Sequence, residues 1–498
     1  MSSYENKRHH REVNGDDDDT KTKEMRANTK LRRTMAPPHW LLLDRYGYST
    51  QPGEDDAGGG SLWAASAITS RGVRFRLSLR AQQPPGVSRL LHSADVPAEI
   101  LRQSAAATSF PGWARFRLTV RSSDGGTVLL ETNCGGGTDY FVMGPIAAAA
   151  AGLSTSPPPP ALALLPPIPR CAGTATTSCG LALMRRAGDG GCYVVAALEQ
   201  AILSGEWYVS FFSSSTGSWG RKAARLPPEL AGWHHHWEVL AVLASLACGG
   251  RFWWLDLRRG LLSCSCDSLL RDEDGQQPHS PPPAVALEFT PLPHITMEQA
   301  REAGTSKYPP VQDRRVTAGA GGRLRYVALR RHRPGRSEAG APEPPALCDG
   351  CRGGTITTWT LGDDRRAWAE DRTVSVADVW RGESYRSTGL PWNAPGFPLV
   401  DPFDPDVVYV SVMEEEGRYG EGHELCVDLR TKEVKSCSGR YKGLNYLNDT
   451  LEPGKCPPAL IVALISYISL VDCVRYYHCS VHGEQQITGA MKGKVFTS

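Results

Sequence analysis

The chain has 498 residues, 41% of them hydrophobic, and it contains 51 glycines and 37 prolines. This hydrophobic content is enough to build a folded core, whereas the glycines and prolines predict many turns and few long helices. The 55 basic and 53 acidic residues leave a net charge of +2, so no overall positive field is available to attract nucleic acid or an anionic membrane.

The two ends of the chain differ in composition from its middle. Residues 1–34 are polar and charged and contain a run of four aspartates, Asp16–Asp19, which predicts a disordered tail. No run in the chain reaches the roughly 18 apolar residues that a membrane span requires. The nearest approach, Ala459–Val471, is short and contains serines. We therefore expect no membrane span and assign residues 456–498 to a C-terminal extension.

The 14 cysteines are expected to be reduced. The first residues contain no apolar stretch of the kind that forms a secretory signal. We therefore expect the protein in the cytoplasm or the nucleus, where thiols stay reduced and several cysteines serve as small apolar residues.

Short strands are predicted from residue 35 to about residue 455. Strict alternation of apolar and polar residues over 73–79 predicts a strand with one solvent-facing side. Residues 116–120 and 127–131 flank Ser123–Gly126, whose composition is typical of a hairpin turn. Further strands are predicted at 40–43, 140–143, 192–198, 207–212, 238–247, 324–329, 355–361, 372–376, 406–413, 424–429 and 433–437.

The most strand-like stretch of the chain is Arg251–Cys266. Its aromatic and branched residues predict two strands, 252–257 and 261–266, joined across a turn at Gly260. A hairpin this small must bury Trp253 and Trp254 against neighbouring sheets.

Three segments are predicted to be connections. Residues 147–169 are rich in alanine and proline, and residues 330–350 are basic and rich in proline, so both are treated as insertions in a single domain over 35–455. Residues 221–237 are predicted to be a loop.

Four units share an apolar strand, a small turn and a second strand or aromatic anchor. They span Phe212 to Trp219, Leu255 to Leu261, Trp359 to Trp368, and Val427 to Val434. Degenerate antiparallel repeats of this size favour a mostly-β, propeller-like array of small sheets, in which each sheet covers the apolar face of the next. Packed β-sandwiches are the alternative.

Several ordered motifs resemble a known family. They are HWLLLDRYGY at His39–Tyr48, DYFVMGP at Asp139–Pro145, LALMRRAGDGGCYVVAAL at Leu181–Leu198, WYVSFFSSSTGSW at Trp207–Trp219, FWWLDLRRGLLSC at Phe252–Cys264, FTPLPH at Phe289–His294, TWTL around Trp359, VADVW at Val376–Trp380 and DPDVVYV at Asp404–Val410. The chain is similar in this order to the plant domain-of-unknown-function 1618 family, which is expanded in grasses. The resemblance implies a propeller-like domain distantly akin to kelch and F-box-associated repeats, and it brings no established activity or catalytic residue.

One aromatic segment is the candidate contact surface for a protein partner. It consists of Trp233, His234, His235, His236 and Trp237. Successive residues of an extended chain point to opposite sides, so the three histidines are not expected to share one metal ion. Tryptophan is enriched at binding hot spots, which makes this segment a candidate contact surface.

Other polar groups are assigned to structural roles. Cys348 and Cys351 have the spacing of a zinc pair, but the chain has no second such pair, so a surface-loop pair is the favoured interpretation. The carboxylates of Asp401, Asp404 and Asp406 are interpreted as turn formers before a strand. Asp256 and Asp428 recur in the same Asp-Leu-Arg setting, which predicts aspartates that bond turn amides or an adjacent arginine.

The sequence contains no phosphate loop, nucleophile elbow or metalloprotease helix. We therefore predict a monomeric, non-enzymatic scaffold that binds an unknown protein through the loops of its repeat domain, with no cofactor and no metal. The alternative is an enzyme whose site lies in a central channel and is assembled from distant residues.

Overall fold

The computed structural model describes residues 41–44, 46–50, 61–107, 116–144, 161–169, 176–186, 191–201, 204–230, 242–271, 284–293, 313–319, 321–330, 354–413, 421–439 and 441–442. All of them belong to one compact unit, Trp40–Ser498, which is separate from Met1–His39. The predictions for residues 1–34, 331–350 and 456–498 lie outside these described residues.

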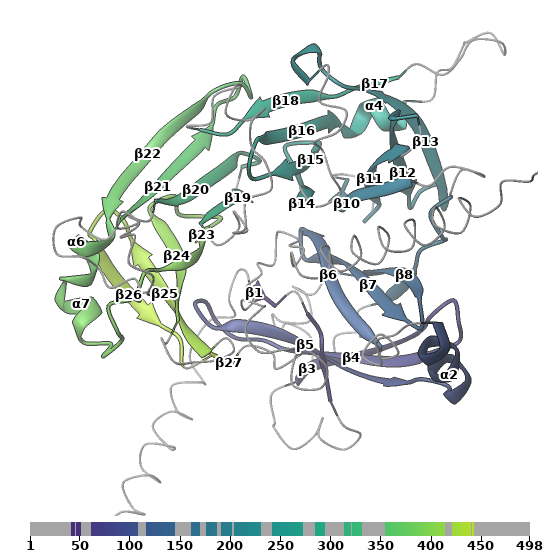
Figure 1. The fold of residues 1–498 in the computed structure, drawn as a ribbon, viewed down its shortest axis with the longest axis horizontal. Helices are drawn as coiled ribbons and strands as arrows, with labels where there is room; N and C mark the ends of the chain where they lie inside the picture. The colour runs from purple at the N-terminus through teal and green to yellow at the C-terminus, as the bar shows by residue number, and fades with distance from the viewer. Residues whose placement is uncertain are drawn as a thin grey trace, which may run out of the picture. The chain divides into compact units, whose positions relative to one another are not determined.

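Six small sheets form a six-bladed β-propeller (Figure 1). Each sheet contains four or five strands, and most neighbouring strands are antiparallel. The mostly-β, propeller-like prediction is therefore confirmed, and the alternative of packed sandwiches is not the arrangement that the chain adopts.

The first two sheets lie in the N-terminal part of the unit. The first sheet contains β1 (Leu42–Leu43), β2 (Tyr48–Ser49), β3 (Ser61–Ile68), β4 (Arg74–Arg80) and β5 (Val87–Asp95). Its order is β1-β5-β4-β3, with β2 also paired to β5. A helix, α2 (Ala98–Ala107), leads to the second sheet, which contains β6 (Arg117–Asp124), β7 (Thr127–Cys134), β8 (Gly137–Met143) and β9 (Leu162–Leu164).

The third and fourth sheets follow. The third contains β10 (Thr176–Arg185), β11 (Tyr193–Ala201), β12 (Trp207–Ser213), β13 (Ser218–Arg225) and the parallel β17 (Val285–Ala286). The fourth contains β14 (Val242–Cys248), β15 (Arg251–Asp256), β16 (Gly260–Ser265) and β18 (Glu288–Pro291), with η2 (Pro228–Leu230) before it and α4 (Cys266–Leu270) after β16.

The last two sheets complete the array. The fifth contains β19 (Arg314–Ala318), β20 (Leu324–Arg330), β21 (Thr355–Leu361) and β22 (Trp368–Ser375). Two short helices, α6 (Val376–Trp380) and α7 (Glu383–Arg386), lead to the sixth, which contains β23 (Gly396–Val400), β24 (Val407–Met413), β25 (Glu421–Asp428), β26 (Glu433–Cys437) and β27 (Tyr441–Lys442). No helix in the described part of the chain is long and apolar enough to span a membrane.

The core is divided among the junctions between neighbouring sheets. The predicted hairpin shows how: β15 pairs with β16 from Arg251↔Ser265 to Asp256↔Gly260. Trp254 packs with residues of the third sheet, whereas Trp253 packs with residues of the fifth. Their exposed fractions are 0% and 3%. Successive side chains of a strand point to opposite faces, so one strand supplies core to both neighbouring junctions.

Pairs of glycines close the first hairpin of three sheets. Gly125–Gly126, Gly249–Gly250 and Gly321–Gly322 all have a positive φ angle, a backbone conformation that residues other than glycine rarely adopt. A Cβ on Gly249 would lie 2.8 Å from the carbonyl oxygen of Gly322, so the turns of the fourth and fifth sheets are in backbone contact. We call the end of the sheets where these turns lie the glycine-turn end.

Two predicted connections contain strands. The predicted loop over 221–237 begins inside β13, and the predicted insertion over 147–169 contains β9. Both strands are fourth in their sheets, and most of their residues are only partly buried or exposed. β13 has a mostly polar sequence without the apolar pattern of a strand, whereas β9 is a three-residue apolar strand within a stretch rich in alanine and proline.

Candidate functional site

The predicted contact segment, Trp233 to Trp237, lies outside the described residues. The described elements on either side are η2 and β14. Leu230, the last residue of η2, is fully buried, and β14 runs from Val242 to the Gly249–Gly250 turn. The described chain resumes at Val242, at the end of β14 opposite the glycine-turn end.

The cysteine pair Cys348 and Cys351 also lies outside the described residues. In the part of the chain that the structure describes, no group of three or more His, Cys, Asp or Glu residues is placed to hold a metal ion. Burial raises the pKa of the thiols of Cys248 and Cys264 to about 12. These two cysteines are therefore protonated, apolar core residues at neutral pH, and poor nucleophiles.

The segment from Asp401 to Asp406 is a turn between β23 and β24. One carboxylate oxygen of Asp401, Oδ1, accepts hydrogen bonds from the amides of Phe403 at 2.7 Å and Asp404 at 3.0 Å. Its other oxygen accepts a bond from the Tyr409 hydroxyl at 3.0 Å, and Asp404 accepts one from the amide of Asp406 at 3.0 Å. The interpretation as turn formers is confirmed for Asp401 and Asp404, whereas the carboxylate of Asp406 pairs with arginines.

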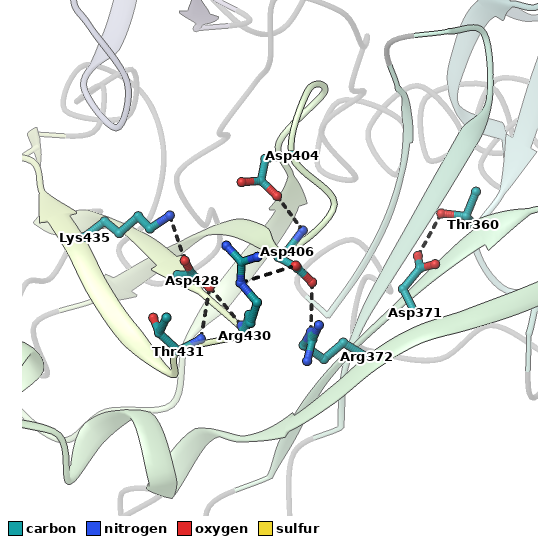
Figure 2. A network of polar contacts seen from close by, with 9 residues as sticks. All are labelled: Thr360, Asp371, Arg372, Asp404, Asp406, Asp428, Arg430, Thr431 and Lys435. Atoms are coloured by element: carbon teal, nitrogen blue, oxygen red, sulfur yellow. Dashed lines mark hydrogen bonds and ion pairs between the residues drawn. The ribbon is translucent and has the colours of Figure 1, made fainter.

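Figure 2 shows that this turn is tied to the neighbouring sheet. The guanidinium of Arg372, on β22, donates to Asp406 at 2.8 Å, and Arg430 lies 3.9 Å from the other oxygen of the same carboxylate. The Arg325 guanidinium, on β20, donates to the carbonyl of Asp401 at 2.7 Å. The charges at this edge are therefore used to join the fifth and sixth sheets.

The aspartates of the two Asp-Leu-Arg motifs have the predicted role. Asp256 accepts from the amide of Arg258 at 2.9 Å, and its other oxygen lies 3.2 Å from the guanidinium of Arg259. Asp428 accepts from the amides of Arg430 at 2.9 Å and Thr431 at 3.1 Å. These are the turn-amide and arginine contacts that the repeated setting predicts.

Electrostatics differ between these two aspartates. Complete burial raises the pKa of Asp256 to about 6, although Arg259 and the Arg258 amide favour its charged form. Burial also acts to raise the pKa of Asp428, but the bonds from Lys435, Thr431 and Arg430 outweigh it and hold this pKa below its ordinary value. The Lys435 ammonium lies 2.7 Å from Asp428.

A charged cluster that the sequence did not predict lies where the first, fifth and sixth sheets meet. It consists of Asp44, Arg315, Ser411 and Glu424, and we call it the closing cluster. Their exposed fractions are 1%, 4%, 1% and 2%. The Ser411 hydroxyl lies 3.0 Å and 3.1 Å from the two oxygens of Glu424, and the Tyr46 amide donates to Asp44 at 3.2 Å. Tyr48 donates its hydroxyl to the other oxygen of Asp44.

The closing cluster alters the acidity of Glu424. Burial raises the pKa of Glu424 to about 8, the Ser411 bond and the charge of Arg315 lower it, and the charge of Asp44 raises it further. At neutral pH this carboxyl is therefore largely protonated. No local signal reveals the cluster, because its members are far apart in sequence and meet only when the propeller forms.

The described chain is thus a six-bladed β-propeller protein whose singled-out carboxylates lie in turns and junctions between sheets. Residues 254–409 match the model of the family described as "Protein of unknown function (DUF1618)", the family that the sequence motifs resemble. No curated protein is similar enough in sequence to match the chain.

Three solved structures illustrate the distant similarities. An apocarotenoid oxygenase mutant from Synechocystis is 10% identical with a TM-score of 0.31, covering 76% of this chain and 77% of that one. The polysaccharide lyase Uly1 is 11% identical with a TM-score of 0.31, covering 85% and 92%. A prolyl endopeptidase is 10% identical with a TM-score of 0.28, covering 70% and 45%. Similarities at TM-scores this low bear on neither the activity nor the partners of the chain.

Proposed function

We propose that this propeller is a non-enzymatic scaffold that binds another protein, as a monomer in the cytoplasm or the nucleus. The observation that carries the proposal is that the distinctive carboxylates serve the fold: Asp256, Asp401 and Asp428 bond turn amides. A rigid array of small sheets that fixes many connections in space is a scaffold suited to recognition.

The contact surface that we propose is the segment from Trp233 to Trp237. Tryptophans supply large apolar areas with few rotatable bonds, and such residues carry much of the binding energy in interfaces. After this segment the described chain resumes with β14, in which Ser245 and Leu246 are buried.

The test is affinity capture with the full chain and with the double variant Trp233→Ala/Trp237→Ala. The matched control is Trp392→Ala, because Trp392 is 43% exposed and lies far along the chain, before β23. We expect a captured protein that is lost with the double variant and kept with the control. With that protein purified, the dissociation constant should rise at least tenfold, or about 1.4 kcal/mol. Partners that all persist in the double variant would contradict the proposed surface.

The alternative proposal is an enzyme with a central site, and the closing cluster is the observation that favours it. Two carboxylates and a guanidinium from three sheets approach one another, and burial has raised the pKa of one of them to about 8. Groups with such shifts occur often at catalytic sites. Exposed fractions of 1% to 4% leave no member accessible to a substrate in this conformation, so we favour the scaffold.

A further inference from the structure

The junction between the sixth and first sheets has the smallest apolar cluster in the described part of the chain. At the junction of the third and fourth sheets, large side chains such as Phe252, Trp254 and Leu262 are buried together. Between the sixth and first sheets, the apolar contacts come from two small groups: Leu42 with Leu399, Val407, Tyr409 and Cys426, and Val87 with Phe397.

The same junction contains the closing cluster. Ser411 lies two residues after Tyr409 on β24, and Glu424 lies two residues before Cys426 on β25. All four side chains therefore lie on the face of the sixth sheet that meets Leu42. Asp44 follows β1 directly, and its amide donates to the carbonyl of Ser88 at 2.8 Å. The junction between the sixth and first sheets, which closes the ring, therefore contains both buried charged groups and a small apolar cluster.

We propose that this junction is a pH-sensitive closure of the propeller, which opens more readily as the pH rises because Glu424 then carries a second negative charge beside Asp44. In the closed form Glu424 is protonated, and the opposite charges of Arg315 and Asp44 both act on it. Ionised Glu424 would add a second buried negative charge near Asp44, and a charge removed from water is costly. In the open form the same carboxylate is hydrated, so opening relieves the repulsion.

The sign follows from the two protonation states. In the closed form the pKa of Glu424 is about 8, and in water its ordinary value is 4.5. Between these values the closed form holds a proton that the open form releases, so closure is strongest below about pH 4.5 and weakens as the pH rises. The equilibrium constant for opening of the junction should increase by up to about tenfold per pH unit until about pH 8, and then level off.

Other ionisable groups face the same junction. Tyr409 and Cys426 lie on the face of the sixth sheet that holds Glu424, and burial raises the pKa of both, so they stay neutral near pH 7. Glu424 is influenced by Asp44 and Arg315. The Cys437 thiol, on β26, has its pKa raised first by burial and then by the charge of Glu424. His92, also in the first sheet, packs against Phe116 at the junction with the second sheet, with 5.2 Å between ring centroids. Its titration has the opposite sign, so it cannot produce a closure that weakens with rising pH.

The test is hydrogen exchange by mass spectrometry on the full chain between pH 5.5 and 7.5, with rates corrected for the intrinsic pH dependence of amide exchange. Peptides covering 41–50 and 396–413 report the junction, and peptides covering β15 and β16 report a junction elsewhere. We expect opening at the first set to rise by up to about 100-fold over this range while the second set changes much less.

Two variants make the result specific to Glu424. Glu424→Gln stays neutral at every pH, so the pH dependence at the junction should disappear. The control is Glu199→Gln, because Glu199 is also buried and accepts from a serine on the next strand, Ser210, at 2.9 Å, but lies within the third sheet. This control should keep the pH dependence of the wild type.

Ser411→Ala provides a second test that does not remove the carboxyl. Because the Ser411 bond favours the ionised form, its loss should move the levelling-off of junction exchange to higher pH, which requires extending the measurements on wild type and variant to about pH 9.5. Equal pH dependence at both sets of peptides, or pH dependence that survives in Glu424→Gln, would overturn the proposal. If Glu424→Gln does not fold, an unshifted Ser411→Ala profile would overturn it.

Discussion

Single aspartates hold the turns of this propeller by accepting hydrogen bonds from backbone amides two and three residues ahead. At Asp428 the accepted bonds come from Arg430 and Thr431, and the carboxylate also pairs with Lys435. A short polar side chain that satisfies turn amides stabilises the turn directly, because an amide left without a partner loses a hydrogen bond.

Replacing this carboxylate should therefore weaken the sixth sheet. We expect Asp428→Ala to lower the free energy of unfolding by about 1–3 kcal/mol, measured by urea denaturation. The control is Asp363→Ala, because the Asp363 side chain is 79% exposed and pairs only across the surface with Arg323 at 2.9 Å. Its loss should change the unfolding free energy by less than about 1 kcal/mol. Equal effects at the two sites would show that the Asp428 bonds do not support the fold.

His92 makes stability depend on acidity. Burial lowers its pKa from 6.5 to about 4, so folded protein holds a neutral imidazole while the unfolded chain takes up a proton below pH 6.5. The stability due to neutral His92 is therefore present above pH 6.5 and lost as the pH falls toward 4. Between pH 7 and 5 this amounts to about 2 kcal/mol.

The contribution of His92 can be isolated by subtraction. We expect wild-type protein to lose about 2 kcal/mol more than His92→Leu between pH 7 and 5 in urea denaturation at each pH. Other groups, Glu424 among them, titrate in both proteins and cancel in the difference. An identical decline in the variant would mean that the imidazole is protonated equally in both states.

Local roles were predictable from the sequence, and roles that depend on distant partners were not. The turn-forming function of Asp256 and Asp428 follows from a motif of three adjacent residues, and the structure confirms it. Asp44 and Glu424 gave no such signal, because what changes the acidity of Glu424 is burial among groups from other sheets. Their juxtaposition depends on ring closure, which no short sequence window contains.

The turn that joins the first two strands of a sheet is the element that recurs most regularly. Glycine pairs at Gly125–Gly126, Gly249–Gly250 and Gly321–Gly322 all adopt positive φ. Adjacent glycines also occur at 190–191, just before β11. They are the clearest internal repeat in the chain, and the four strand–turn–anchor units predicted from sequence are less regular. Three of those units are third and fourth strands, but the unit from Leu255 to Leu261 joins the second and third.

Two of those predicted aromatic anchors fasten one sheet to the previous one. The indole of Trp219, on β13, donates to the carbonyl of Pro166 at 2.8 Å, and that of Trp368, on β22, donates to Pro291 at 2.8 Å. The proline follows β9 in one case and ends β18 in the other. Each anchor thus links the fourth strand of one sheet to the outer strand of its predecessor.

Substitutions at two neighbouring glycines measure the cost of a steric contact separately from the cost of backbone strain. At Gly250 a Cβ would meet nothing within 4 Å, so Gly250→Ala should cost only the positive-φ strain of about 1–2 kcal/mol. At Gly249 the same strain is joined by a Cβ 2.8 Å from the Gly322 carbonyl oxygen, which is backbone and cannot rotate away. We therefore expect Gly249→Ala to have the lower melting temperature. A reversed order would show that the turns of the fourth and fifth sheets are not in contact.

At the scale of the whole molecule, the ring is a series of junctions with unequal apolar content. Five of the apolar clusters join consecutive sheets along the chain, whereas the contacts of Leu42 and Val87 join the last sheet to the first. The first sheet also has β1 paired in parallel with β5, Leu42 opposite Val87. A closure built on so short a strand should open at a lower free energy than the rest of the molecule unfolds.

Two leucine substitutions distinguish opening of this junction alone from unfolding of the whole propeller. Leu42 and Leu262 are 1% and 0% exposed, and removing a buried leucine side chain costs about 2–5 kcal/mol. Leu262→Ala should lower the free energy of global unfolding by that full amount. Leu42→Ala can lower it only by the free energy that holds the closure shut, because beyond this the open ring becomes the stable folded form and no longer uses Leu42. We therefore expect Leu42→Ala to give the smaller loss in urea denaturation, together with faster hydrogen exchange confined to 41–50 and 396–413. Equal losses, with exchange accelerated everywhere, would mean that the ring opens only when the whole propeller unfolds.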